Sequence, residues 1–277
     1  MAVKTKPEER SKQELLAELE KLNKAQVRIK RRSTFLLSII AMLVLVTSTL
    51  AWFTITTFAS VENIQMNITT GVELRVDMES HGSDISQYKK TITADMINSY
   101  LRTNHNTTMA DQLLDPVTSS NGIAFRNQGG STMQPNDISY LEFKMWFIGS
   151  RDMWVHLSSD TATSLNNATT SVTTTSTGAQ ADIVRAIRVS FEDSGSAAIY
   201  EPNAGSAVAG QSTFDLPTPM NYSNSTRLFH LNKLEPKQIT VRLWLEGEDP
   251  ECDNDVQEAD LAVDLLFNGT DEENNTF

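Results

Sequence analysis

The chain has 277 residues and a formal net charge of −12 at pH 7, so it has room for one large folded unit or two small ones. Its single cysteine excludes an internal disulfide, and an exported region must therefore rely on its own core or on a bound metal. Residues 1–34 carry ten basic and five acidic side chains, whereas the rest carries thirteen and thirty. We expect no nucleic-acid partner for so acidic a chain.

Residues 1–33 are predicted to form a basic amphipathic helix in the cytoplasm. Ser11 and Glu14 have the spacing of a capping box, which marks a helix start. The interpretation that we favour places this helix on the inner leaflet of the membrane, and the alternative is a short coiled coil that pairs chains or docks a partner. Both use the same apolar stripe of Leu15, Leu19, Leu22 and Ile29.

Residues 34–57 are predicted to form a single transmembrane helix that serves as a signal-anchor. The run "TFLLSIIAMLVLVTSTLAWF" has about 20 uncharged residues, enough to cross a hydrocarbon layer roughly 30 Å thick. The basic residues in front of it place the N-terminus in the cytoplasm and the acidic remainder outside the cell. These membrane-orienting residues are Arg28, Lys30, Arg31 and Arg32.

The same segment also offers two sites for signal cleavage. Ala51 and Ala59 each have a small residue two positions earlier, as signal peptidases prefer. Cleavage after either alanine would release the protein to the cell surface with a β-rich start that could complete the sheet of a neighbour. A retained helix would hold the domain close to the bilayer, which suits a scaffold.

Residues 58–277 are predicted to form a mainly β extracellular domain, an antiparallel sandwich of the jelly-roll type. After the apolar run the hydrophobic period changes to two, and Thr70 and Gly71 separate two alternating segments that read as a hairpin. The segment 237–247 alternates apolar and polar residues, as expected for a strand buried on one face. Further strands are expected within 138–150, 151–159, 183–193, 225–234 and 260–269.

Two segments depart from the strand pattern. Residues 93–104 have apolar side chains at helical spacing behind Thr93 as a cap, so we expect a helix that covers one end of the sandwich. Residues 166–180 are dominated by threonine and serine, and we expect a mobile surface loop there.

The usual signatures of catalysis are missing, and we expect no enzymatic activity. The sequence has no His-Glu-x-x-His pair, no Gly-x-Ser-x-Gly elbow and no phosphate-binding Gly-x-x-x-x-Gly-Lys loop. His156 is interpreted as a strand histidine with satisfied hydrogen bonds. Cys252 lies among acidic residues, which disfavour a reactive thiolate.

Residues 243–255, "LWLEGEDPECDND", are the densest cluster of carboxylates. Carboxylate oxygens on a loop are what calcium prefers, but the spacing does not match an EF-hand, and an acidic turn between two strands is commonly just solvated. No cofactor is required by the sequence, and calcium is the one that we consider. Its ligands would be Glu246, Glu248, Asp249, Asp253 and Asp255.

The junction between apolar run and first strand resembles a known family. Ala51, Trp52, Phe53 and Thr54, followed by Gly71, Leu74 and Val76, are similar to the signal region of the TasA and camelysin group of Firmicute cell-surface proteins, which carry a SipW-type signal. The likeness covers about 30 residues. The segments "LDPVTSSNGIAF", "YLEFKMWFIGS" and "VRLWLEGEDPEC" also resemble parts of clostridial surface proteins.

The resemblance implies an exported jelly-roll protein, and in the case of TasA a subunit of biofilm-matrix fibres joined by donation of an N-terminal strand. We therefore expect a non-enzymatic envelope protein that is structural or matrix-forming and that associates with the membrane and with itself or other surface proteins. The alternatives are a carbohydrate- or calcium-binding surface module and a surface metallopeptidase, as camelysin has been classed. No zinc motif of a peptidase is present to carry over.

Overall fold

The structure is a computed structural model that describes residues 16–17, 19–24, 59–69, 74–111, 114–127, 130–133, 139–161, 168–203 and 205–277. The chain divides into two compact units, Met1–Thr56 and Thr57–Phe277. In the first unit the described residues are helical, and Glu20 and Lys24 form an ion pair one turn apart, at 2.7 Å. The leucines predicted to form its apolar stripe are exposed where they are described, at Leu19 and Leu22.

The predicted membrane segment, 34–57, lies outside the described residues, as do the basic residues in front of it. Among the described helices none is both long and apolar enough to cross a bilayer.

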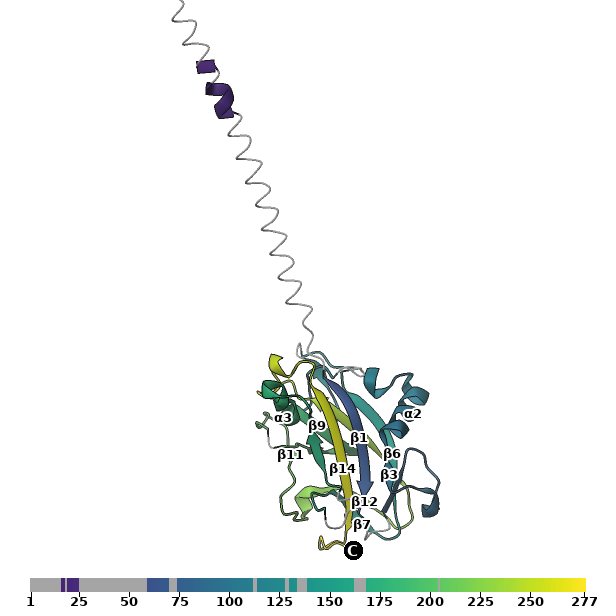
Figure 1. Ribbon diagram of the computed structural model, residues 1–277. Coiled ribbons are helices and arrows are strands. Elements are labelled where there is room, and N and C mark those ends of the chain that lie inside the picture. The colour runs from purple at the N-terminus through teal and green to yellow at the C-terminus, as the bar shows by residue number, and fades with distance from the viewer. Residues whose placement is uncertain are drawn as a thin grey trace, which may run out of the picture. The chain divides into compact units, whose positions relative to one another are not determined.

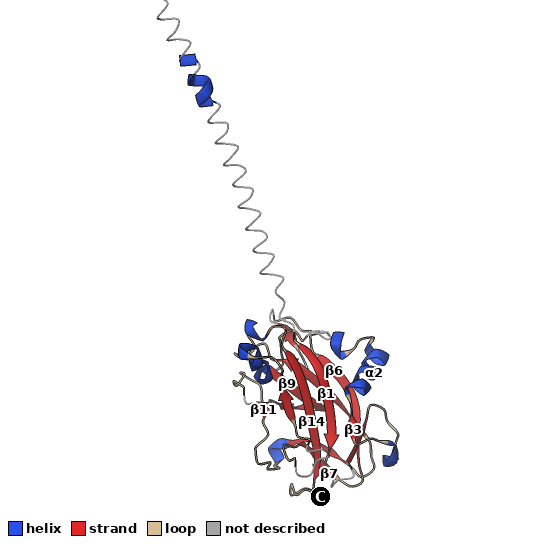
Figure 2. Cartoon of the chain, viewed as in Figure 1, coloured by secondary structure: helices blue, strands red, loops and turns tan. Residues whose placement is uncertain are grey.

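The second unit is mainly β, as predicted, and is built from two six-stranded sheets (Figures 1 and 2). The first sheet has the order β12-β7-β14-β1-β3, with β8 also paired to β14. Its strands are β1 (Ser60–Ile68), β3 (Thr91–Ile92), β7 (Met153–Leu157), β8 (Ser171–Thr173), β12 (Arg227–Leu231) and β14 (Asp260–Thr270).

The second sheet has the order β11-β10-β9-β13-β6-β2. Its strands are β2 (Leu74–Asp77), β6 (Leu141–Gly149), β9 (Ile187–Asp193), β10 (Ser196–Tyr200), β11 (Thr213–Phe214) and β13 (Lys237–Leu245). A separate small ribbon pairs β4 (Val117–Thr118) with β5 (Arg126–Asn127).

One hydrophobic core fills the space between the two sheets. Phe267 on β14 meets Phe147 on β6 and Phe191 on β9 edge to face, with ring centroids 5.1 and 5.7 Å apart. All three rings are fully buried, and the cluster takes in apolar side chains from both sheets. The unit is therefore a sandwich that holds its layers together by apolar packing.

The prediction of a wholly antiparallel sandwich is wrong at two places. β1 runs parallel to β14, from Ser60 opposite Asp260 to Ile68 opposite Phe267, and β10 runs parallel to β11. The remaining strand pairs are antiparallel among the described residues. Side-chain alternation is the same in both arrangements, so the sequence pattern does not distinguish them.

The predicted hairpin of β1 and β2 is also wrong. β1 pairs with β14 and β3, whereas β2 pairs with β6 in the opposite sheet. Both strands contribute apolar side chains to the core, although they belong to opposite sheets and do not lie side by side. A short connection between alternating segments fits a crossing between layers as well as a hairpin.

Two further predictions differ from the structure. The serine- and threonine-rich segment 166–180 contains β8, whose Val172 pairs with Val263 of β14, so it is not wholly a loop. β13 is buried on both faces over its second half, because Trp244 is covered by a further layer of chain, as is Glu246 just after the strand. That layer includes β4 and β5.

The helix predicted at 93–104 is confirmed as α2 (Ala94–His105). Thr93 occupies the cap position without a side-chain bond, and Asn106 ends the helix in the left-handed conformation. Ile97 and Leu101 are buried, and α2 contacts both β1 and β6, one strand of each sheet. The described residues of this unit form one further α-helix, the short α3 (Ile183–Ala186), which leads into β9.

Candidate functional site

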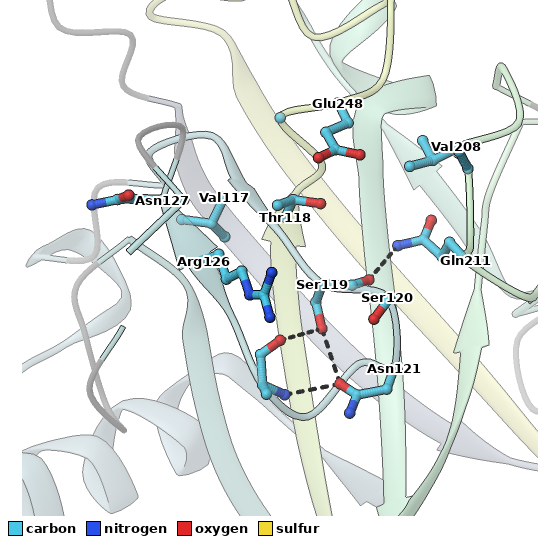
Figure 3. Close-up of a pocket in the computed structure, with 14 residues that line it drawn as sticks. Val117, Thr118, Ser119, Ser120, Asn121, Arg126, Asn127, Val208, Gln211 and Glu248 are labelled. Carbon is cyan, nitrogen blue, oxygen red and sulfur yellow. Dashed lines mark hydrogen bonds between the residues drawn. The ribbon is translucent and has the colours of Figure 1, made fainter. Parts of the chain in front are cut away.

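A pocket of about 600 Å³ opens on the outer side of the second sheet (Figure 3). Three segments far apart in the sequence enclose it, namely the ribbon of β4 and β5, the stretch 208–211 and the stretch 247–248 just after β13. Most of the side chains around it are polar. The lining residues are Val117, Thr118, Ser119, Ser120, Asn121, Ala124, Arg126, Asn127, Gly130, Val208, Ala209, Gln211, Gly247 and Glu248.

The ribbon that forms one wall is tied to the end of β13. Val117 and Glu246 make a parallel bridge, and the amide of Gly247 donates to the carbonyl of Val117 at 2.9 Å. A Cβ atom on Gly247 would lie 3.3 Å from Pro116, so the close approach of the two backbones favours glycine at this position.

The turn between β4 and β5 is held by its own side chains. Ser119 Oγ donates to the carbonyl of Ala124 at 2.8 Å and accepts from the amide of Gly122 at 3.0 Å. Asn121 Oδ1 accepts from the amides of Ile123 and Ala124, both at 3.0 Å. Such side-chain bonds to nearby backbone are the way serine and asparagine stabilise turns.

A small aromatic cluster lies between the pocket ribbon and the second sheet. Phe125 stacks on Tyr140 with ring centroids 4.2 Å apart and meets Trp244 edge to face at 5.2 Å. All three are buried, together with Val117 and Ile199. This second cluster holds the ribbon on the sheet by apolar packing, and it explains why Trp244 is buried on the face that alternation assigned to solvent.

The fully buried carboxylate of Glu246 organises the floor of the pocket. Its Oε2 accepts from Trp244 Nε1 at 3.1 Å, from Gln211 Nε2 at 2.9 Å and from the amide of Ser119 at 3.3 Å, and its Oε1 accepts from the amide of Glu248 at 3.3 Å. One carboxylate therefore joins all three segments that enclose the pocket, since each supplies a donor.

Gln211 extends this network toward a buried ion pair. Its Oε1 accepts from Arg188 Nε at 3.2 Å, while Arg188 Nη2 lies 2.6 Å from Asp249 Oδ2 and 3.1 Å from Glu201 Oε1. Burial raises the pKa of Asp249 to about 6, and the charge of Arg188 acts in the opposite direction. The guanidinium of Arg188 is completely buried, so this group is structural and does not face the pocket.

The charged side chains that do face the pocket are Arg126 and Glu248. Both are exposed, and Figure 3 shows Arg126 directed between Thr118 and Ser119, with Glu248 on another side of the hollow. Within the described part of the chain neither side chain has a hydrogen bond or ion pair to another residue, in contrast to Glu246 beneath them. The pocket thus combines a rigid polar floor with a free cation and a free anion.

The structure separates the residues predicted to bind calcium. Glu246 and Asp249 are buried and already bonded, Glu248 lines the pocket, and Asp253 accepts from the amide of Asp255 at 2.8 Å at the start of a short 3₁₀ turn. The described residues hold no group of three or more His, Cys, Asp or Glu side chains arranged to bind a metal ion. Calcium binding at this segment stays a prediction.

The two predicted cleavage positions differ in what the structure shows. Ala51 lies outside the described residues. Ala59 is buried, its carbonyl accepts from the amide of Leu114 at 3.1 Å, and the amide of the next residue, Ser60, donates to the carbonyl of Ala259 at 3.2 Å. Cleavage at either position would leave β1 in the mature chain.

The interpretation of His156 is confirmed. Its ring nitrogens lie 3.0 Å from Thr226 Oγ1 and 2.9 Å from Thr270 Oγ1, and the side chain is fully buried. Burial, aided by the charge of Arg227, lowers the pKa of His156 to about 4. Burial and nearby carboxylates raise the pKa of the Cys252 thiol to about 12, as expected for an unreactive cysteine.

The sequence pattern does not reveal the pocket. Arg126, Gln211 and the turn at Ser119 carry no motif, and they meet only because the ribbon and the stretch 208–211 fold over β13. The available signal was indirect: the glycine- and serine-rich run "TSSNG" marks a turn, and the acidic run after β13 marks a loop end. No protein-family model matches the chain, and no similar curated protein or solved structure was found.

Proposed function

We propose that the protein is a non-enzymatic, structural or matrix-forming component of a bacterial cell surface, of the TasA-like kind that the N-terminal resemblance implies. In this proposal the segment 34–57 carries the β domain, a jelly roll by that resemblance, to the outside, with the N-terminus in the cytoplasm if the segment is retained. The arginines and lysine before the segment and the acidic remainder after it support this orientation.

The observation that carries the proposal is the position of β1. β1 starts three residues after the predicted membrane segment and pairs with β14 along almost its whole length, with one irregularity between Val61 and Asn63. On its other edge, among the described residues, only Met66 and Asn67 pair with another strand, the two-residue β3. β1 is therefore next to the edge of its sheet, and it is the first strand of the domain.

The same strand also contributes strongly to the core. Ile64, Met66 and Ile68 are each about 1% exposed, so a domain without β1 would lose these side chains and leave one edge of β14 unpaired. A strand of this kind from a second copy supplies both the missing core residues and the missing hydrogen bonds. That property supports assembly of copies at the cell surface.

Strand complementation gives a direct test of assembly. A chain that begins at residue 70 is expected to lack a cooperative unfolding transition, and a synthetic peptide of residues 58–69 is expected to restore it. A peptide in which Ile64 and Met66 are replaced by aspartate is the matched control, since it keeps the backbone donors but not the apolar side chains. A chain that folds alone, or that ignores the native peptide, would overturn the strand-donation model.

Export is tested separately by mass spectrometry of the protein from bacterial envelopes. A mature chain that starts at Trp52 or Ser60 would show cleavage after Ala51 or Ala59, and an intact N-terminal helix would show a retained anchor. Recovery of the full chain only from the cytosolic fraction would overturn both forms of the proposal.

The pocket favours a second function, a carbohydrate-binding module on the same domain. Its lining of hydroxyl, amide and charged groups suits a ligand with many hydrogen-bonding groups, and its volume of about 600 Å³ lies in the range of small-molecule sites. Binding of the full-length protein to a glycan array tests this function, with the melting temperature in calcium and in chelator as the parallel test of a calcium-binding module.

A further inference from the structure

We propose that the pocket binds a saccharide unit that carries one carboxylate group, with Arg126 as the residue that binds the carboxylate. This inference rests on the second proposed function, carbohydrate binding, and names the class of ligand. It does not depend on strand donation or on the membrane segment.

The positive charge of Arg126 is available to a ligand. The domain is strongly acidic, and two neighbouring arginines are each held by two carboxylates, Arg188 by Asp249 and Glu201, and Arg242 by Glu142 and Glu192. Among the described residues, Arg126 is the one cationic side chain that lines the pocket, and no acidic side chain pairs with it. Its planar guanidinium is therefore free to bind a carboxylate with two parallel hydrogen bonds.

The position of Glu248 limits the charge of the ligand. A second negative charge on the ligand would be repelled by this carboxylate, which also lines the pocket. Neutral hydroxyl groups, by contrast, can donate to it. The pairing of one free cation with one free anion thus favours a ligand with a single negative charge and hydroxyl groups elsewhere, and disfavours nucleotides and polyphosphates.

Several neutral polar groups of the pocket are also available to hydrogen-bond a ligand. Within the described residues, the hydroxyls of Thr118 and Ser120 and the Nδ2 group of Asn121 make no side-chain hydrogen bond to protein, although Asn121 Oδ1 is used in the turn. Hydroxyl groups of a sugar both donate and accept, so they match such a mixed set. The pocket is too polar to favour an apolar ligand.

The pocket lining is held rigidly in place. Ser119 and Gln211 are fixed by the buried carboxylate of Glu246, which accepts from both, and the aromatic rings of Phe125 and Trp244 pack under the ribbon. A ligand would meet groups that are already held in place, so little ordering free energy is lost on binding.

The test uses the full-length protein in detergent, with methyl β-glucuronide as the acidic probe and methyl β-glucoside as its neutral counterpart. Ligand-observed NMR titration measures both dissociation constants. We expect the acidic probe to bind at least tenfold more tightly than the neutral one. We expect Arg126→Gln to remove that difference, and Arg126→Lys to retain part of it because one hydrogen bond of the pair is lost.

Arg102→Gln is the matched control, because Arg102 is an exposed arginine on α2, away from the pocket lining. It should leave both constants unchanged, and the melting temperatures of all variants should agree. Equal binding of the two probes, unaffected by Arg126→Gln, would overturn the carboxylate anchor and leave carbohydrate binding intact. Absence of binding to both probes and to a glycan array would overturn the carbohydrate function itself.

Discussion

At the scale of single residues, the main buried polar side chains of the domain have hydrogen-bond or ion-pair partners. Glu246 has four donors, His156 has two threonine hydroxyls, and Arg188 has two carboxylates. Within the described residues the exception is Glu201 Oε1, which lies 3.1 Å from Arg188 without a hydrogen bond of acceptable geometry. A buried polar group without its partner costs about 1–3 kcal/mol, so substitution of any partner should be visible in stability.

Gly122→Ala is expected to destabilise the turn at the pocket wall. Gly122 has a φ of +67°, and an added Cβ would lie 2.7 Å from Ser190 Cβ. Gly195→Ala is the control, because Gly195 has a φ of +86° but no atom within 4 Å of an added Cβ. Strained backbone costs about 1–3 kcal/mol in both variants, and the clash adds to it only at Gly122. Equal losses in urea unfolding would show that Ser190 does not restrict the turn.

His156 predicts a pH dependence of stability. Its folded-state pKa of about 4 lies below the ordinary value of 6.5, so the unfolded chain binds a proton more readily between those limits. The contribution of His156 is therefore complete above pH 6.5 and is lost as the pH falls from 6.5 to 4, by roughly 3 kcal/mol in total. The difference in unfolding free energy between wild type and His156→Gln isolates this group. A difference independent of pH would contradict the buried, neutral imidazole.

At the scale of elements, β1 links the sequence pattern to assembly. Its alternation places Ile64, Met66 and Ile68 in the core, and its backbone joins β14 on one side, while β3 covers only two residues of the other. The strand thus contributes to stability through side chains and through parallel hydrogen bonds. A truncation of the N-terminal segment that removes β1 is expected to cost far more than one that stops before Ser60.

Ile64→Ala tests the contribution of β1 to the core. Ile64 is 1% exposed, and loss of an isoleucine side chain in a packed core costs about 2–5 kcal/mol. Asn63→Ala is the control, since Asn63 is the preceding residue of the same strand and is exposed, where substitutions change stability by about 0.5 kcal/mol or less. Similar losses in the two variants would show that β1 is not packed as described.

At the scale of the whole molecule, two sheets and one main core hold the domain together without covalent cross-links. The core cluster draws residues from both sheets and from α2, and a second, smaller cluster holds the ribbon of the pocket. The pocket therefore depends on the outer layer, and its polar floor depends on the carboxylate of Glu246, the residue that follows β13.

Stability should be independent of redox conditions. Cys252 is the single cysteine of the chain and is partly buried, and its raised pKa of about 12 keeps the thiol protonated at neutral pH. Melting temperatures in oxidising and reducing buffer are expected to agree. Labelling with a thiol reagent should be at least tenfold slower in the native protein than in denaturant, because the thiolate is the reacting form. Rapid native labelling would contradict the burial of Cys252.

Much of the fold follows from the sequence, but the partners of the strands do not. Period-two alternation identified β6, β7, β12, β13 and β14, and helical spacing identified α2. The same alternation predicted a hairpin of β1 with β2, although the two strands lie in opposite sheets. Alternation reports which side of a strand is buried, and long-range packing decides which strand lies beside it.

The candidate site was the least predictable part. The carboxylates of 246–255 attracted attention as a calcium site, yet Glu246 and Asp249 serve as buried acceptors for donors from distant segments. Their role depends on Arg188 and Gln211, whose approach no local pattern reveals. Arg126 carries no motif either, since one exposed arginine on a short strand is ordinary until the other segments that enclose the pocket are known.

The parallel pairing of β1 with β14 has a mechanical consequence. Tension applied between the start of β1 and the end of β14 pulls the two strands in opposite directions along their common axis. The hydrogen bonds between them are then sheared together and do not open one after another, as they would if the strands were peeled apart from one end. A domain stretched between its two chain ends would consequently resist extension at the strand pair that joins its first strand to its last.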